Sequence, residues 1–351
     1  MRQKQKKSTR WTAIALALLL ALGAAFALSG CAGDDSESGA DEQEEETELD
    51  GSQQEASVSQ VITIAALNGP TGMGMAPLIG ETDKYDITVY QAPDEVLAKV
   101  IKGEVDIAAV PSNVASVLYN KTEGAVQAAA IQTGGILYIV ENPAEDAPAK
   151  NELSQLSGCT IYGSGQGGVP EYVLRQLLSD AGIDPDNDVT IQWLASHSDV
   201  ASSLLTNPGS VALLPEPFVT TVKAKNDAVV TSFDLNALWK AAYNDDLPMG
   251  VLVAQKSFLE ERKGDWDIFA ADMEEAVQLV NDDPAQAAQM IVEAGIGNEA
   301  AVVEQAIPQC NICFITGAEM KAALSNLYEI LNRLQPAAIG GALPDESFYL
   351  Q

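Results

Sequence analysis

The chain has 351 residues, with 50 Asp and Glu against 19 Lys and Arg, and a formal net charge of −31. Such an acidic chain repels phosphate backbones, which excludes nucleic-acid binding as its role. A hydrophobic content of 47% and a charged content of 20% predict a globular protein with a large core. The one long apolar stretch is terminal, which excludes a membrane protein with many spans, and the length predicts two lobes.

The first thirty residues predict an export signal. A basic run, MRQKQKKSTR, is followed by an apolar stretch and then by Leu28-Ser29-Gly30-Cys31. This is the order of a secretory signal peptide, and the alternative of a transmembrane anchor is disfavoured because no basic cluster follows the stretch. The tetrad resembles a bacterial lipobox. That resemblance implies cleavage before Cys31 and lipidation of this cysteine, which would hold the protein on a membrane.

Residues 31–60 predict an acidic, disordered tether. From Ala32 to Gln60 the chain carries eleven acidic residues and no basic one. Such a composition buries too little apolar surface to offset its ordering entropy, and its like charges extend it. We therefore expect a solvated spacer that separates a folded domain from the membrane.

From residue 61 onward, short apolar strands alternate with helices. In the first half, strands are expected at Val61–Ala66, Tyr85–Gln91, Val105–Val110, Val126–Gln132 and Gly135–Val140, with helices after Pro93 and at Val114–Tyr119. After the connection Glu141–Lys150 the same rhythm restarts. It gives strands at Cys159–Tyr162, Val189–Trp193 and Ser210–Leu214, and helices at Pro170–Ala181, Ser196–Leu205 and after Phe218. A last strand at Gly250–Ala254 precedes a tail that we expect to be wholly helical. This pattern predicts an α/β protein with mostly parallel sheets and helices on both faces of each sheet.

Three stretches carry a resemblance to a known family. Val61–Thr71, Asp94–Ala108 and Ala212–Pro217 resemble the nitrate, sulfonate and taurine branch of the solute-binding proteins of ABC importers. That branch also includes binders of a pyrimidine precursor of thiamine. The resemblance implies a two-lobed type II periplasmic-binding-protein fold, with lobe I at 61–141 plus 249–351 and lobe II at 142–248.

The candidate ligand contacts lie in the loops that follow the strands. In open parallel sheets the ligand crevice lies beyond the carboxyl ends of the strands, and helices that start there present free N–H groups to it. The candidate ligand-binding residues are Asn68, Gly69, Thr71, Gly72, Met73, Ser112, Asn113, Thr133, Ser164, Gly165, Gln166, Gly167, Gly168, Glu171, His197, Glu216 and Phe218. Candidates for apolar walls are Met73, Met75 and Met249, and candidates for stacking on a ring are Tyr90, Tyr138, Trp193 and Phe218.

Two motifs in these loops, the glycine-rich segment and the Ser-His-Ser-Asp segment, can also be explained by local structure without a ligand. The glycines between residues 163 and 168 let the backbone approach a ligand, or they only form a tight turn. They match neither Gly-x-Gly-x-x-Gly nor a P-loop, so they do not predict nucleotide binding. His197, the only histidine, stands in a Ser-His-Ser-Asp helix start, which is typical of a capping loop, with hydrogen bonding to a ligand as the alternative. No Ser/His/Asp triad can be assembled around it.

The cysteines predict neither a metal site nor a redox motif. Cys310 and Cys313 have Cys-x-x-Cys spacing, but no second pair completes a zinc site. Outside the cytoplasm they form either a disulfide or two buried thiols, and the pattern leaves both open. We expect Cys159 to be a core thiol, and we expect no metal and no cofactor.

The positions of the charged residues restrict the chemical class of the ligand only partly. The arginines after Cys31 are Arg175, Arg262 and Arg333, and none lies in a candidate loop. Bidentate clamping of a carboxylate or sulfonate is therefore not expected. Helix N-termini remain as anion donors, while Glu216 and Glu171 are candidate acceptors for an amine or heteroaromatic N–H.

The resemblance implies a capture protein rather than an enzyme. Its two lobes would close over a small-molecule solute and present it to an ABC permease and its ATPase. We expect a lipid-anchored monomer on the outer face of the cytoplasmic membrane or in the periplasm. An enzyme on the same fold, of the chorismate-dehydratase or pyrimidine-synthase type, is disfavoured by the single histidine and the lipobox. A ligand-sensing subunit of a membrane receptor is the other alternative.

Overall fold

The computed structural model describes residues 57–145 and 147–351. The expected export signal, the lipidation site Cys31 and residues 31–56 of the expected tether lie outside the described residues. Within the described ranges, no helix has both the length and the apolar character that a membrane span requires.

The first sheet has six strands in the order β11-β4-β10-β3-β1-β2. β1 to β4 run in one direction, whereas β10 and β11 run antiparallel to their neighbours. The strands are β1 (Ile62–Leu67), β2 (Tyr85–Tyr90), β3 (Ile107–Pro111), β4 (Val126–Thr133), β10 (Gly250–Gln255) and β11 (Ile312–Ile315).

The second sheet has five strands in the order β7-β6-β8-β5-β9. Only β5 runs against the others, since it is antiparallel to both β8 and β9. The strands are β5 (Leu137–Asn142), β6 (Thr160–Gly163), β7 (Thr190–Trp193), β8 (Ser210–Pro215) and β9 (Val230–Asp234). Most strands of each sheet thus share one direction, which confirms the predicted fold class.

Helices cover both faces of each sheet. The α-helices are α1 (Pro70–Met73), α2 (Pro93–Ile101), α3 (Ser112–Lys121), α4 (Val169–Asp180), α5 (His197–Thr206), α6 (Phe218–Lys225), α7 (Leu235–Tyr243), α8 (Lys256–Glu261), α9 (Lys263–Asp282), α10 (Pro284–Glu293), α11 (Ala300–Ala306) and α12 (Gly317–Leu334). Short 3-10 helices are η1 (Ala76–Leu78), η2 (Leu153–Leu156), η3 (Ile307–Gln309), η4 (Pro336–Ile339) and η5 (Glu346–Phe348).

The alternation of side chains along each strand divides the apolar core into layers. In β1, Ala65 and Leu67 join a cluster that contains residues of α2, α3 and α12, whereas Ile62, Ile64 and Ala66 join a cluster with residues of α9 and α10. In the second sheet, one face packs against α4 and α7 and the other against α5 and α6. Because both faces are covered, the strands are apolar along nearly their whole length.

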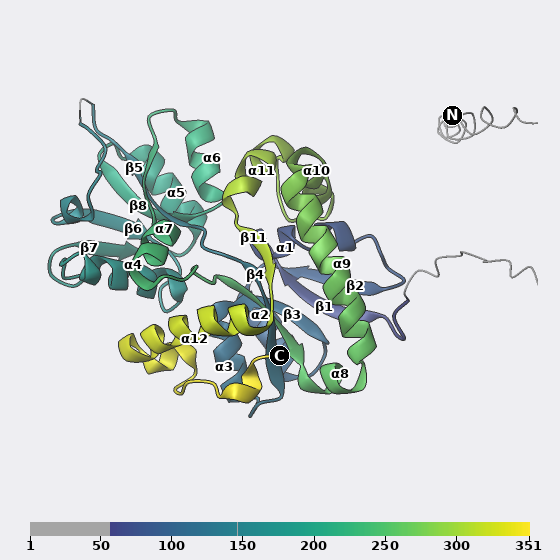
Figure 1. The fold of residues 1–351 in the computed structure, drawn as a ribbon. Helices are drawn as coiled ribbons and strands as arrows, with labels where there is room; N and C mark the ends of the chain where they lie inside the picture. Colours follow the sequence, from purple (N-terminus) through teal and green to yellow (C-terminus); the bar gives the residue numbers. More distant parts are fainter. Residues whose placement is uncertain (1–56, 146) are drawn as a thin grey trace, which may run out of the picture. The chain divides into compact units, whose positions relative to one another are not determined.

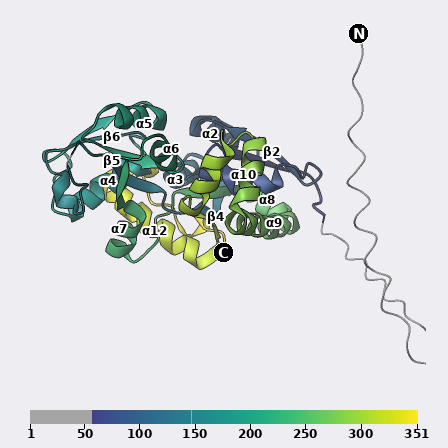
Figure 2. The same cartoon turned by 90° about the horizontal axis from the view of Figure 1, so that it is seen from above.

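The chain crosses between the sheets twice. β5 to β9, with α4 to α7, form one group, while the first and last elements form the other (Figure 1). Seen from above, α4, α5 and α7 lie in one group and α8, α9 and α10 in the other (Figure 2). The return crossover falls between Tyr243 and Gly250, close to the expected 248–249 boundary.

The first crossover differs from the expected 141–142 boundary. Residues 137–141 were assigned to the first lobe, but β5 pairs entirely within the second sheet. The chain instead crosses at Gly134 and Gly135. A Cβ at Gly135 would lie 2.4 Å from the Cβ of Asn236, so only glycine fits where the backbone passes this side chain.

The expectation of a wholly helical tail was wrong, because β11 pairs with the edge of β4. Its four residues are too short a run to stand out between two helical patterns. Three further elements, β9, α7 and α11, were not expected from the sequence.

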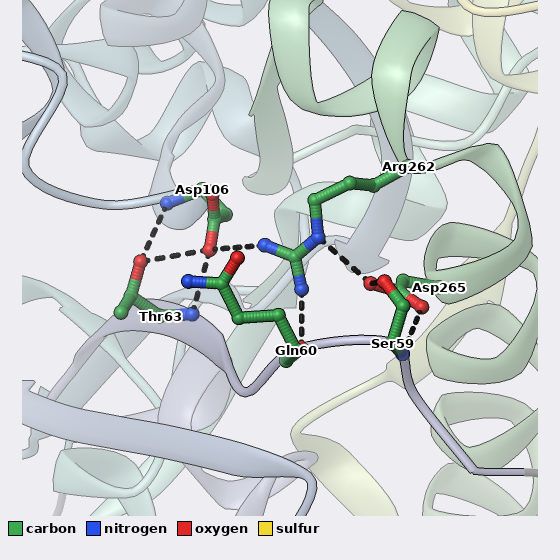
Figure 3. A network of polar contacts seen from close by, with 6 residues as sticks. All are labelled: Ser59, Gln60, Thr63, Asp106, Arg262 and Asp265. Atoms are coloured by element: carbon green, nitrogen blue, oxygen red, sulfur yellow. Dashed lines mark hydrogen bonds and ion pairs between the residues drawn. The ribbon is translucent and has the colours of Figure 1, made fainter.

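An ionic network fixes the beginning of the folded chain (Figure 3). The backbone N–H and hydroxyl of Ser59 donate to the Asp265 carboxylate at 2.7 and 2.8 Å, and Arg262 donates to the carbonyl of Gln60. Arg262 also pairs with Asp265 at 2.7 Å and with Asp106 at 3.3 Å. The last residues of the expected tether, Ser59 and Gln60, are therefore held against the start of α9, so the tether ends slightly earlier than expected.

Candidate functional site

A pocket of about 470 Å³ lies between the two sheets. Both lobes contribute to its wall, because the carboxyl ends of β1, β3, β4 and β8 open into it. The lining residues are Leu67, Asn68, Gly69, Pro70, Thr71, Pro93, Pro111, Asn113, Val114, Thr133, Ile136, Leu137, Gly165, Gln166, Gly167, Gly168, Val169, Pro170, His197, Pro215, Glu216, Pro217, Phe218, Met249 and Gly250.

Most of the candidate ligand residues meet at this pocket, although they are far apart in the sequence. Those in its wall are Asn68, Gly69, Thr71, Asn113, Thr133, Gly165, Gln166, Gly167, Gly168, His197, Glu216 and Phe218. Five candidates do not line it: Gly72, Met73, Ser112, Ser164 and Glu171.

Two of these five are packing residues. A Cβ at Gly72 would lie 2.4 Å from the carbonyl oxygen of Leu67, so glycine is needed there for close packing of α1 on β1. Met73 is 1% exposed and belongs to the core that α9 and α10 cover, as does Met75. Met249 alone of the three candidate methionines lines the pocket.

Ser112 and Asn113 attach α3 to its surroundings. Ser112 is fully buried, and its hydroxyl donates to the carbonyl of Pro248 at 2.8 Å in the return crossover. Its own carbonyl accepts from the Tyr328 hydroxyl of α12 at 2.8 Å. Asn113 does line the pocket, but its amide donates to the carbonyl of Ala338 at 3.2 Å. Position 112 is therefore structural.

Glu171 holds the glycine-rich loop in place from outside the pocket. Its carboxylate accepts from the backbone N–H of Gly167 at 2.8 Å and from Arg175 at 2.9 Å. Gly165 and Gly167 have φ values of 79° and 80°, which L side chains rarely adopt. The loop therefore lines the pocket with its backbone, while the Glu171 carboxylate is occupied by Gly167 and Arg175 outside the pocket.

Thr133 and Gln132, at the end of β4, carry buried polar atoms without a partner. Both side chains are 1% exposed. Within the described residues, the Thr133 hydroxyl oxygen and the Gln132 side-chain carbonyl oxygen have no hydrogen-bond partner. An unsatisfied buried polar group costs about 1–3 kcal/mol. Thr133 also lines the pocket, which makes its hydroxyl a candidate partner for a molecule bound there.

His197 and Ser164 form a polar pair at the edge of the pocket. The Ser164 Oγ lies 2.5 Å from His197 Nδ1, and Ser164 is 3% exposed. Burial lowers the pKa of His197, which favours the neutral ring. In the described chain no carboxylate is hydrogen bonded to His197, so the pair lacks the orienting acid of a catalytic triad.

Phe218 adds an aromatic face beside His197. The ring centroids of these two residues are 5.2 Å apart at an interplanar angle of 47°. Among the other stacking candidates, Tyr90, Tyr138 and Trp193 are absent from the described pocket wall. Tyr138 instead donates to the carbonyl of Gln309 at 3.3 Å, which links the two lobes.

Glu216 is the one carboxylate among the residues that line the pocket. It is 3% exposed, and Thr220 donates to it through its backbone N–H at 3.0 Å and its hydroxyl at 3.1 Å. Burial raises the pKa of Glu216, while the two Thr220 hydrogen bonds and the Lys223 charge oppose that rise.

Glu216 also borders a second hollow of about 720 Å³. This hollow lies between α6 and β9 of the second lobe and α11 and η3 of the first. Its wall includes Lys223, Asp227, Asp234, Gln305 and Gln309. The pocket and the hollow thus meet at a single carboxylate near the contact between the lobes.

Several pocket residues could not be predicted from the sequence because they precede or begin strands that run antiparallel to their sheets. The predicted contacts all follow strands, whereas β5 and β10 run against their neighbours. Their first residues therefore lie at the same edge as the ends of the other strands. In this way Ile136, Leu137 and Gly250 enter the wall. No local signal in the sequence reports the direction of a strand.

The three described cysteines have apolar surroundings. Cys159, Cys310 and Cys313 are free in the structure, which has no bond between the last two. Cys310 packs in the core covered by α9 and α10, while Cys313 packs against the core on the other face of the sheet. Across the described ranges, no group of three or more His, Cys, Asp or Glu side chains is suited to holding a metal ion.

Known proteins match this chain in sequence and in fold. The sequence model of the NMT1-like family matches residues 78–294. A Bacillus subtilis (strain 168) protein named "Putative binding protein YtlA" is 23% identical over 207 residues, which are 57% of this chain and 58% of that relative.

Solved structures share the fold. An ABC transporter structure from Parabacteroides distasonis matches with a TM-score of 0.71 at 24% identity, covering 83% of this chain and 99% of that one. The periplasmic aliphatic sulphonate binding protein SsuA from Escherichia coli matches with a TM-score of 0.67 at 15% identity, covering 83% and 92%. At these identities the likeness shows the fold.

Proposed function

Because this chain belongs to the NMT1-like family, we propose that it is the extracytoplasmic solute-binding protein of an ABC importer. One observation carries the proposal: twelve candidate residues, drawn from loops of both lobes, line a single pocket. The descriptions of similar proteins as a binding protein, an ABC transporter and a sulphonate binding protein support it.

The solute is held without being altered. Pockets of about 300–1,000 Å³ suit small molecules, and this one measures about 470 Å³. The chain crosses between the lobes at two places, near Gly134 and between Tyr243 and Gly250. Rotation about these two segments closes the lobes over the solute and excludes water. The closed form then docks on a permease that works with an ATPase.

The protein acts at a membrane surface as a monomer. Lipidation of Cys31 anchors the protein at the outer face of the cytoplasmic membrane or within the periplasm. The acidic segment that follows keeps the two lobes at a distance from the membrane. The Ser59–Asp265 hydrogen bonds support this arrangement, because they give the tether a firm attachment point on α9.

Two measurements on the purified full chain test the proposal. Native mass spectrometry under gentle conditions should detect a co-purified small molecule. Small-angle X-ray scattering, before and after removal of that molecule by dialysis from a partly unfolded state, should show a smaller radius of gyration with the solute bound. Chemical conversion of the solute, or equal radii in both states, would contradict capture by closure.

A further inference from the structure

The residues around the pocket set the charge of the solute. We infer that the pocket selects a small organic cation, whose protonated amine donates to Glu216 and Thr133. This inference rests on the proposed function and goes further, because it names the solute class. It also separates this chain from a similar protein that is described as binding sulphonates.

No cationic side chain faces the solute. None of the described residues in the pocket wall is Lys or Arg. Arg175, on the helix that starts at the glycine-rich loop, is paired with Glu171 at 2.9 Å and with Asp186 at 2.7 Å. His197 is the remaining titratable base in the wall. An anionic solute would therefore leave water without a counter-charge to receive it.

Three of the helices that begin at the pocket, α4, α5 and α6, have acceptors of their own near their N-termini, whereas α1, α2 and α3 begin without a side-chain cap. In the loop just before α4, Glu171 accepts from the N–H of Gly167 at 2.8 Å. At α5, the Ser196 hydroxyl accepts from the N–H of Asp199 at 3.1 Å, and Asp199 places a carboxylate in the first turn. At α6, Glu216 accepts from the N–H of Thr220 at 3.0 Å. These carboxylates and this hydroxyl offset the positive ends of the helix dipoles.

The pocket does have acceptor capacity to spare. Each Glu216 oxygen accepts one hydrogen bond from Thr220, and a carboxylate oxygen accepts more than one. The Thr133 hydroxyl, 1% exposed and without a partner in the described chain, lines the same pocket. An ammonium group offers three N–H donors and no acceptor, so it suits a pocket wall that contains both of these acceptors.

The aromatic faces favour a cation as well. His197 and Phe218 both line the pocket, with ring centroids 5.2 Å apart. The face of an aromatic ring attracts a positive charge, and the attraction grows when the site is shielded from water. A charged amine bound at Glu216 would share the pocket with the His197 and Phe218 rings.

The experiment compares solutes that differ in charge but keep the same carbon skeleton. The full chain is tested by thermal shift and calorimetry with benzylamine, benzyl alcohol and phenylmethanesulfonate, and with propylamine, propanol and propanesulfonate. At least one amine should raise the melting temperature more than its alcohol, and neither sulfonate should raise it. Glu216→Gln should weaken amine binding by at least about 30-fold, as expected when one partner of a buried charge pair is lost.

Two further variants separate a loss of binding from structural damage, with Glu141→Gln as the control and Thr133→Val as the test of the second contact. Glu141→Gln removes a carboxylate that is 2% exposed and pairs with Lys150 at 2.7 Å, outside the pocket wall. It should lower stability and leave amine binding unchanged. Thr133→Val should weaken amine binding without loss of stability. If both amines fail to raise the melting temperature, or if a sulfonate raises it and Glu216→Gln strengthens that effect, the inference is overturned. Closure around a sulfonate would still leave the proposed capture function intact, whereas the lack of closure with any co-purified solute would count against that function itself.

Discussion

Thr220 donates twice to the same carboxylate, since its backbone N–H and its hydroxyl reach the two oxygens of Glu216 at 3.0 and 3.1 Å. The two residues are one helical turn apart, at the start of α6. This arrangement holds a 3%-exposed carboxylate at the point where the pocket and the second hollow meet. Glu216 therefore accepts hydrogen bonds from the first turn of α6 and also lines the pocket.

Replacement of Thr220 by valine should destabilise the protein by about 1.5–3 kcal/mol, because a hydrogen bond to a charged acceptor is lost while Glu216 stays buried. Urea denaturation at neutral pH measures the change. Thr220→Ser keeps the hydroxyl and should retain most of the stability. Equal losses in the two variants would contradict this account, because only Thr220→Val removes the hydroxyl that donates to Glu216.

Glu216 should make stability depend on pH in a defined direction. Burial raises its pKa above the ordinary value of 4.5, and the two Thr220 hydrogen bonds and the Lys223 charge oppose that rise. A carboxyl with a raised folded-state pKa favours the folded state fully below 4.5, and this contribution is lost as pH rises through the folded-state value. The urea midpoint of wild type should thus fall relative to Glu216→Gln as pH increases from 4.5. A difference that does not vary with pH would contradict this prediction.

Arg262→Ala should destabilise the protein by about 3 kcal/mol, because it leaves Asp265 with a 5%-exposed carboxylate and no counter-charge. Burial alone would raise the pKa of Asp265, but the Ser59 hydrogen bonds and Arg262 hold it below its ordinary value. Wild type loses the stabilisation from this lowered pKa as pH falls through the folded-state value, so the variant should lose less stability than wild type over that acidic range. Lys263→Ala is the matched control. Its side chain is 75% exposed, so loss of its pair with Asp267 should change stability by less than about 0.5 kcal/mol.

Gly250→Ala should damage the pocket wall directly. Its Cβ would lie 2.5 Å from the Thr71 Cγ2 and 2.9 Å from the Thr133 Oγ1, which forces both side chains to shift. We expect a loss of about 1–3 kcal/mol in stability, together with weaker solute binding, measured by thermal shift with and without solute. Gly80→Ala serves as the control, because nothing lies within 4 Å of a Cβ there. Its stability should stay within about 0.5 kcal/mol of wild type.

Thr133→Val should keep or slightly raise the stability of the empty protein, because the hydroxyl that it removes has no partner among the described residues. Solute affinity should fall by about tenfold, the effect of one lost hydrogen bond. Thr122→Val gives the contrast, since its hydroxyl donates to the Leu118 carbonyl at 2.8 Å and lies outside the pocket wall. That variant should lose stability and bind solute normally. The opposite pattern in the two variants would contradict a ligand role for Thr133.

Local patterns in the sequence predicted most of the elements. Near-continuous apolar runs such as Val126–Gln132 and Ser210–Leu214 became β4 and β8, because a strand covered on both faces is apolar at every position. Glycine-rich and proline-containing turns marked the ends of strands. Twelve of the candidate residues could be named because those turns follow strands in a parallel arrangement.

The residues that escaped prediction depend on contacts between distant segments. Nothing near β5 or β10 reveals that they run against their sheets, so the roles of Ile136 and Gly250 could not be foreseen. Ser112 and Glu171 are in the right loops, but Pro248 and Gly167 take up their side-chain hydrogen bonds. Cys310 and Cys313 are close in sequence and face opposite sides of a sheet.

The sequence by itself determined the class of fold, the alternation of strands and helices, and the family, because these follow from local periodicity and turn residues that each segment carries on its own. Only the tertiary structure decided which polar groups are free to meet a solute. Whether Thr133 lacks a partner, or whether Glu216 is shielded from water, depends on neighbours that folding brings from elsewhere in the chain. Burial and hydrogen bonding are properties of the packed molecule, and no single segment contains them.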